Sequence, residues 1–172
     1  MAYCFNLFLI ISFLLFQTSI LPYFRFNYEF FNLMNLYVVY LVLYRPIQEI
    51  IVFVVLTGIL MDSFSFCPFG LYMTIYLWLS LGIKWALKYL HKGSVILVPM
   101  IISGVILIEN IMIMVIISLI ENSFYFHPEK FRSIIFQLIC GIFIGPFLIF
   151  LIKDLQAKWN IWSFEKIFKH FG

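Results

Sequence analysis

Two carboxylates are candidates for chemistry because each lies in or beside a long apolar run. Glu109, followed by Asn110, lies near the middle of the run 94–120, where an unpaired carboxylate costs about 2.5 to 3.5 kcal/mol on insertion scales. It must therefore face protein or water. It is either a proton or substrate site, or a hydrogen-bonded packing contact between helices. Both interpretations stay open, and the functional one predicts that Glu109→Gln abolishes activity.

Asp62 is the second carboxylate, and it follows directly after the apolar run 47–61. A charge at the membrane boundary costs far less than one at the midplane, and together with Ser63 this one can cap a helical turn. A Pro-x-Gly turn signal follows at Pro68 and Gly70. We expect a structural or partner-binding turn made by Gly58, Asp62, Pro68 and Gly70, and we expect the chain to fold around it.

The other titratable residues form no catalytic or ligand-binding pattern. The chain has three His and eight acidic residues, with no helical pair of metal ligands, no phosphate-binding glycine loop and no dinucleotide motif. Its three Cys are odd in number and lie in or beside apolar runs, which argues against a disulfide framework or a zinc site. We predict no enzymatic activity, no metal site and no cofactor.

The composition is that of an integral membrane protein. Of 172 residues, 65% are hydrophobic and only 11% are charged, which is more apolar side chain than a soluble domain of this size can cover. Long continuous apolar runs, rather than alternating ones, indicate helices as the spanning elements. A formal charge of +3 with scattered basic residues does not favour nucleic-acid binding.

The sequence predicts an all-α, polytopic membrane protein with about six transmembrane helices in one compact bundle. Residues 1–152 form the helical domain, and a cytoplasmic amphipathic tail, 153–172, should lie on the membrane surface. The expected helices are 4–21, 30–44, 47–61, 69–87, 94–120 and 131–152.

The second and third runs are each about 15 residues, or about 22 Å as helix, short of a ~30 Å core. They are either two short spans or a re-entrant hairpin protected by neighbouring helices. Glycines in the apolar runs can serve internal packing or contact with a partner, and the sequence does not separate these roles. These are Gly58, Gly82, Gly104, Gly141 and Gly145.

The distribution of basic residues orients the chain. With both termini cytoplasmic, eight Lys and Arg face the cytoplasm and three face outward, as the positive-inside rule requires. Several lysines of the fourth-to-fifth connection and of the tail should then contact anionic lipid or cytoplasmic partners. These are Lys84, Lys88, Lys92, Lys166 and Lys169.

The turn motif resembles a known family. Its residues are Gly58, Asp62, Pro68, Gly70, Leu71 and Tyr72, with Arg45-Pro46 and Gln17-Thr18-Ser19 upstream. In these positions the chain resembles the rod shape-determining protein MreD family, by motif over about 37–87 and by segment layout over its whole length. Where many relatives carry a glycine ahead of the proline, this chain has Phe66-Cys67, and a Pro-Asp-like entry to the second helix appears here only as Asn32 or Asn35.

The resemblance implies a non-enzymatic scaffold of the cell-wall elongation machinery in the bacterial inner membrane. Its implied partners are an MreC-like membrane protein, the actin-like MreB, and a peptidoglycan polymerase and transpeptidase. The layout is also similar to the substrate-binding subunits of energy-coupling-factor transporters. The alternative is therefore a small-solute transporter, or its binding subunit, with a site around Glu109, Asn110 and Asp62.

Overall fold

The computed structural model describes residues 2–20, 32–65, 68–89, 97–121 and 128–168, with side chains of the last segment described over 131–159. All regular structure in these residues is helical. The elements are α1 (Ala2–Leu15), the short π-helix η1 (Phe16–Ile20), α2 (Leu33–Tyr44), α3 (Ile47–Phe64), α4 (Leu71–Ala86), α5 (Leu97–Glu121) and α6 (Pro128–Phe168).

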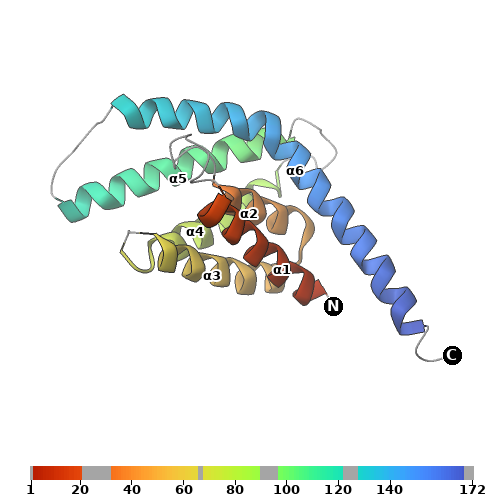
Figure 1. Cartoon of the computed structure of the whole chain (residues 1–172). Coiled ribbons are helices and arrows are strands. Elements are labelled where there is room, and N and C mark those ends of the chain that lie inside the picture. Colours follow the sequence, from red (N-terminus) through yellow and green to blue (C-terminus); the bar gives the residue numbers. More distant parts are fainter. Residues whose placement is uncertain (1, 21–31, 66–67, 90–96, 122–127, 169–172) are drawn as a thin grey trace.

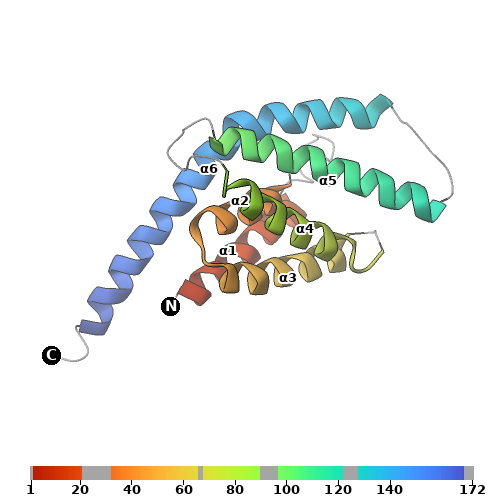
Figure 2. The ribbon, with the colours of Figure 1, turned by 180° about the vertical axis from the view of Figure 1, so that it is seen from behind.

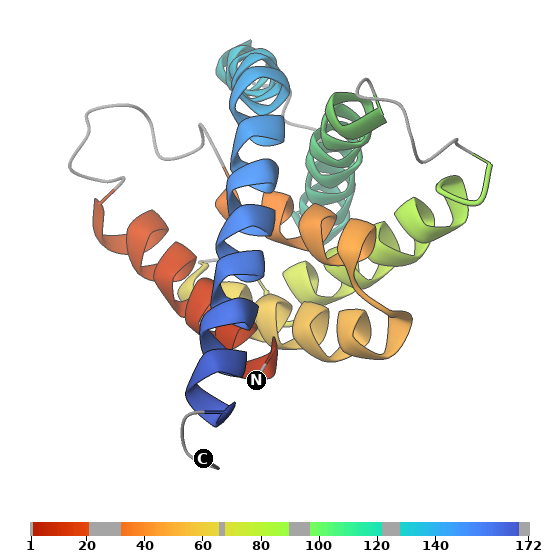
Figure 3. The ribbon, with the colours of Figure 1, turned by 90° about the vertical axis from the view of Figure 1, so that its right-hand side faces the viewer.

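The helix α2 is the centre of the molecule. It contacts each of the other five α-helices, and every residue from Leu33 to Val42 is buried. The pair α5 and α6 lies on one side of it, and α1 and α3 lie on the other (Figures 1 and 2), while Figure 3, seen from the right-hand side of Figure 1, shows the helices grouped around it. The turn at Asp62 is at one end of the α3–α4 pair, so the chain folds around α2 rather than around that turn.

The boundaries of the central helices follow from local sequence. Asn32 caps α2 by accepting a hydrogen bond from the Met34 amide at 3.1 Å. Arg45 precedes a proline and is extended, with φ of −119°, because a following proline disfavours helical backbone. Pro46 then serves as the N-cap residue of α3.

Three of these helices are long and apolar enough to cross a membrane. They are the segments Ile47–Phe64, Leu97–Leu119 and Phe131–Trp159. By contrast, α2 has 12 residues, about 18 Å of helix, which is shorter than a ~30 Å hydrocarbon core. Because α2 is buried from Leu33 to Val42, most of it meets protein rather than lipid.

The last helix is longer than the sequence predicts. It continues through the expected end at residue 152 and reaches Phe168, so the expected tail begins as an uninterrupted extension of α6. It contains Pro146 and bends along its course (Figure 1), because an internal proline removes one helical hydrogen bond and displaces the preceding turn. The placement of the tail on the membrane surface stays a prediction.

Candidate functional site

Glu109 is held in the interior by side chains from other helices. It lies on α5 and is only 4% exposed. The Nδ2 atom of Asn32 donates to its Oε1 at 2.8 Å, and the Nδ2 atom of Asn35 donates to its Oε2. Asn32 also donates to the Tyr76 hydroxyl at 3.0 Å, which adds α4 to the group. We call Asn32, Asn35, Tyr76 and Glu109 the polar core.

The orientation of Asn32 is set by its place at the start of α2. Its Oδ1 atom accepts from the Met34 amide, and Gln17 of η1 donates to the same oxygen at 3.5 Å. The NH₂ group must therefore point the other way, toward Glu109 and Tyr76. A single residue, Asn32, thus caps the central helix and binds the α5 carboxylate.

The polar core pairs Glu109 with neutral amides of the protein, and the cavity beside it is small. Both carboxylate oxygens of Glu109 already accept hydrogen bonds, and the ion pair found among the described residues lies elsewhere, between Arg45 and Glu49. The adjoining cavity, bordered by Asn32, Asn35 and Gln137, has a volume of about 10 Å³. That is about the space of one water molecule, whereas cavities for small organic ligands are about 300 to 1,000 Å³.

Asn110 does not share this site with Glu109. Its Nδ2 atom donates to the Ile106 carbonyl at 2.8 Å and to Oε1 of Gln137 at 2.9 Å. Gln137 belongs to α6, so the two neighbouring residues of α5 face different helices. The structure therefore divides the expected Glu109–Asn110 site into an α2-facing contact and an α6-facing contact.

Asp62 caps the following helix instead of its own. It is 4% exposed and accepts from the backbone amides of Gly70, Tyr72 and Met73 at 3.0, 2.8 and 3.3 Å. These amides belong to the start of α4, and the first amides of a helix have no carbonyl acceptor one turn earlier within it. A carboxylate there also interacts favourably with the helix dipole. The Ser63 hydroxyl, which was expected to help in capping, donates to the Ile59 carbonyl.

The glycines of the same turn have definite conformational roles. Gly70 has φ of 97°, a left-handed conformation that is easy only for glycine. A Cβ on Gly58 would lie 2.4 Å from the Met73 Cα, so α3 and α4 are in backbone contact there. Pro68 is exposed at the tip of the turn. Of the expected turn residues, Gly58, Asp62 and Gly70 therefore hold α3 against α4.

The remaining glycines divide into two classes that the sequence could not separate. A Cβ on Gly141 or Gly145 would lie within 2.6 Å of isoleucine side chains of α5, so both glycines are buried in the α5–α6 contact. A Cβ on Gly82 or Gly104 would have no described neighbour within 4 Å. These two line an open groove of about 340 Å³ between α4 and α5, and each of the described residues that line it is apolar or glycine.

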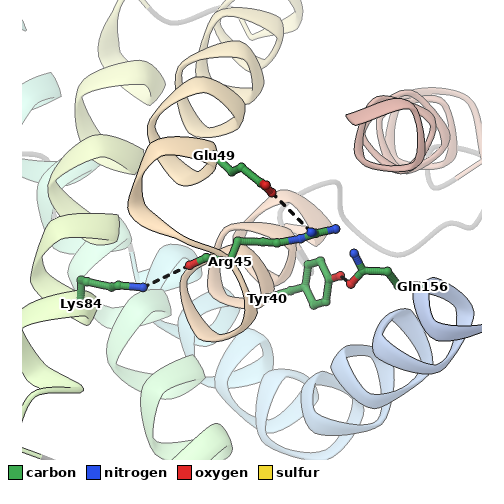
Figure 4. A network of polar contacts seen from close by, with 5 residues as sticks. All are labelled: Tyr40, Arg45, Glu49, Lys84 and Gln156. Atoms are coloured by element: carbon green, nitrogen blue, oxygen red, sulfur yellow. Dashed lines mark hydrogen bonds and ion pairs between the residues drawn. The ribbon is translucent and has the colours of Figure 1, made fainter. Parts of the chain in front are cut away.

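A second polar cluster lies at the other end of α2 (Figure 4). Nη1 of Arg45 pairs with Oε2 of Glu49 at 3.4 Å, and the Tyr40 hydroxyl donates to Oε1 of Gln156 on α6. Lys84 of α4 approaches from the opposite side and donates to the Arg45 carbonyl at 3.2 Å and to the Val42 carbonyl at 3.3 Å. It therefore caps the end of α2, where a cation is favoured by the helix dipole.

The structure places only some of the lysines expected to contact lipid or cytoplasmic partners. Lys84 is half-buried and Lys88 is exposed, one turn further along the chain. Lys92 and Lys169 lie outside the described residues, as does the side chain of Lys166. Within the described part of the chain, no group of His, Cys, Asp and Glu is arranged to hold a metal ion.

Sequence reasoning missed the partners of Glu109. The signal was available, because Asn35 is a strongly polar residue inside an apolar helix and such residues in membrane proteins usually hydrogen-bond across helices. Tyr76 gave no such signal, since tyrosine is common in this chain.

None of the known family models matches this chain, and no curated protein or solved structure is significantly similar to it.

Proposed function

We propose that this protein is a non-enzymatic scaffold of the bacterial inner membrane that serves cell-wall elongation. It would link an MreC-like membrane protein and the actin-like MreB to a peptidoglycan polymerase and transpeptidase. The motif residues of the Asp62 turn motivate the assignment. The membrane setting is supported by three helices of sufficient length and apolar character, and a six-helix, multi-pass bundle with both termini in the cytoplasm is part of the proposal.

The observation that carries a scaffold role is the open groove between α4 and α5. Gly82 and Gly104 face it with no described neighbour within 4 Å of a Cβ position, whereas the other helical glycines are packed against the protein's own backbone, at Gly58, or side chains, at Gly141 and Gly145. Lipid tails and leucine side chains are equally apolar, so helices associate in membranes chiefly where small residues let backbones approach closely. We therefore assign this groove to a transmembrane helix of the MreC-like partner.

Co-purification tests this assignment. The full chain, extracted from native membranes in mild detergent, should retain the MreC-like partner, and Gly104→Leu should remove most of it by filling the groove. Ile139→Phe is the matched control, because Ile139 is exposed on α6 outside the groove. Equal recovery of the partner with both variants would refute the groove assignment, and recovery of an ATPase pair instead would refute the scaffold.

The alternative, small-solute transport, would need the polar core to open. The cavity beside it holds about one water, and the Glu109 oxygens are occupied by the protein's own amides. Native mass spectrometry of the gently purified chain separates the two functions. A stoichiometric bound solute that is lost in Glu109→Gln would favour transport over the scaffold.

A further inference from the structure

We propose that an anionic phospholipid occupies the pocket formed by the ends of α2 and α4 and the start of α5, with its phosphate on Lys84 and Lys88. The pocket has a volume of about 410 Å³. Of the described residues that line it, six are apolar or aromatic: Val42, Leu43, Tyr44, Leu87, Leu97 and Val98. The other two are the lysines.

The two lysines form a cationic wall, in which Lys84 is held by hydrogen bonds and Lys88 is exposed. Lys84 lies in the last turn of α4 and Lys88 in the turn that follows the helix, and both line the pocket. Lys84 is held by the Val42 and Arg45 carbonyls, and an ammonium group has three donors, so one remains for an anion. Lys88 is exposed. Among the described residues that line the pocket there is no carboxylate to neutralise the pair.

A third cation lies close to the same pocket. The Lys153 ammonium of α6 is 5.5 Å from the centre of the Tyr44 ring, and that ring lines the pocket. The end of the molecule at which α2 and α4 finish and α5 begins therefore carries positive charge from two helices, α4 and α6. In the proposed orientation it faces the cytoplasmic leaflet, which attracts basic groups because its lipids are anionic.

The occupant of the pocket must be amphiphilic, because the pocket has both apolar and cationic lining residues. Soluble phosphate would use the two ammonium groups but gain nothing from the valine and leucine side chains. A zwitterionic lipid would fill the apolar part but bring its own cation to the lysines. A phospholipid with a net negative headgroup satisfies both parts, with the phosphate on the ammonium groups and an acyl chain along the apolar wall.

Lipid binding to the purified full chain tests the proposal. In vesicles or mild detergent, native mass spectrometry should detect phosphatidylglycerol retained in preference to phosphatidylcholine. Lys88→Gln should weaken that retention about fivefold, as expected for one basic residue near an anionic surface. Lys158→Gln, which removes an exposed charge of α6 outside the pocket, should leave it unchanged. We choose Lys88 because Lys84 also caps α2.

A second variant tests the pocket itself. Val98→Trp should fill the pocket and reduce phosphatidylglycerol retention without changing the charge. Equal retention of both lipids, equal effects of Lys88→Gln and Lys158→Gln, or displacement of the lipid by millimolar glycerol phosphate would overturn the proposal. The inference rests on the membrane placement within the proposed function but not on its protein partners, so loss of the MreC-like partner would leave this result unaffected.

Discussion

The carboxylates of Asp62 and Glu109 are both buried, yet each is satisfied by a different kind of donor. Asp62 accepts three backbone amides, which are present whatever the side chains of those residues. Glu109 accepts two side-chain amides that come from the start of α2. Substitution of Asp62 therefore disturbs the start of α4 and its attachment to α3, whereas substitution of Glu109 disturbs the contact between α5 and α2.

At Asp62, we expect alanine to destabilise the protein by about 1 to 3 kcal/mol, because several amide donors lose their acceptor. Asp62→Asn should cost less, since it keeps one oxygen acceptor. Thermal unfolding in detergent measures both, and Ser63→Ala on the exposed neighbouring residue is the control. A well-folded Asp62→Ala protein that melts with the wild type and retains every partner would show that this turn is dispensable.

At Glu109, the geometry distinguishes glutamine from leucine. Asn32 cannot turn its amide over, because its oxygen caps α2, but the oxygen of Asn35 has no partner among the described residues. Asn35 can therefore reverse and accept from a glutamine at 109. We expect Glu109→Gln to unfold near the wild-type temperature and Glu109→Leu to lose about 1 to 3 kcal/mol, since the Asn35 amide loses its acceptor and the Asn32 amide keeps only the Tyr76 hydroxyl.

The Glu109→Gln variant also tests whether the charge of Glu109 has a functional role. If the protein has the proposed scaffold function and the carboxylate contributes only packing, Glu109→Gln should restore normal cell shape in a strain that lacks the wild-type protein, at a normal protein level. Loss of that activity in a normally folded Glu109→Gln protein would instead assign a functional role to the charge.

At the scale of helices, the glycine spacing makes a prediction about α3 and α4. Gly58→Ala should weaken the protein strongly, because the new methyl group would lie 2.4 Å from the backbone of Met73 and a backbone atom cannot rotate away. Gly82→Ala on α4 is the matched control, since no described atom lies within 4 Å of its Cβ position. It should be neutral or stabilising by about 0.5 to 1 kcal/mol through helix propensity.

Melting temperatures of the two alanine variants check this prediction. A Gly58→Ala protein as stable as Gly82→Ala would mean that α3 and α4 are not in backbone contact.

The helical segments could be predicted from sequence because apolar runs and prolines mark them directly. The end of α2 at Tyr44 and the start of α3 at Ile47 follow from Arg45-Pro46. The turn after Asp62 follows from its Pro-x-Gly signal. The continuation of α6 past residue 152 could not be predicted, because a change from apolar to amphipathic residues does not by itself end a helix. The sorting of glycines required the packing distances, since all five occur in similar apolar surroundings.

The partners at the site were harder to predict than the elements. Glu109 was identifiable as a buried acid, but Asn32 and Asn35 are more than seventy residues away in the chain and meet it only through the fold. Lys84 was predicted to reach headgroups, whereas its ammonium first satisfies the carbonyls at the end of α2. A single sequence carries no direct record of such long-range pairs.

For the whole molecule, the proposed topology predicts which sites are accessible from each side of the membrane. In a chain freed of its native cysteines, Ser63→Cys at the exposed end of α3 should react with an impermeant maleimide added to intact spheroplasts. Lys88→Cys, at the opposite end of the bundle, should react only after the inner membrane is opened. Labelling in the reverse pattern would invert the orientation and place the lysines outside.

The burial of α2 has a consequence for biosynthesis. Because α2 is short and carries polar side chains, it is not stable in lipid by itself. The Glu109 carboxylate that binds Asn32 and Asn35 is synthesised some seventy residues later. The central helix α2 is thus synthesised well before α5, which supplies the carboxylate that binds it. We expect a pulling-force profile of nascent chains to show a late tension peak as α5 emerges, and Glu109→Leu to reduce that peak.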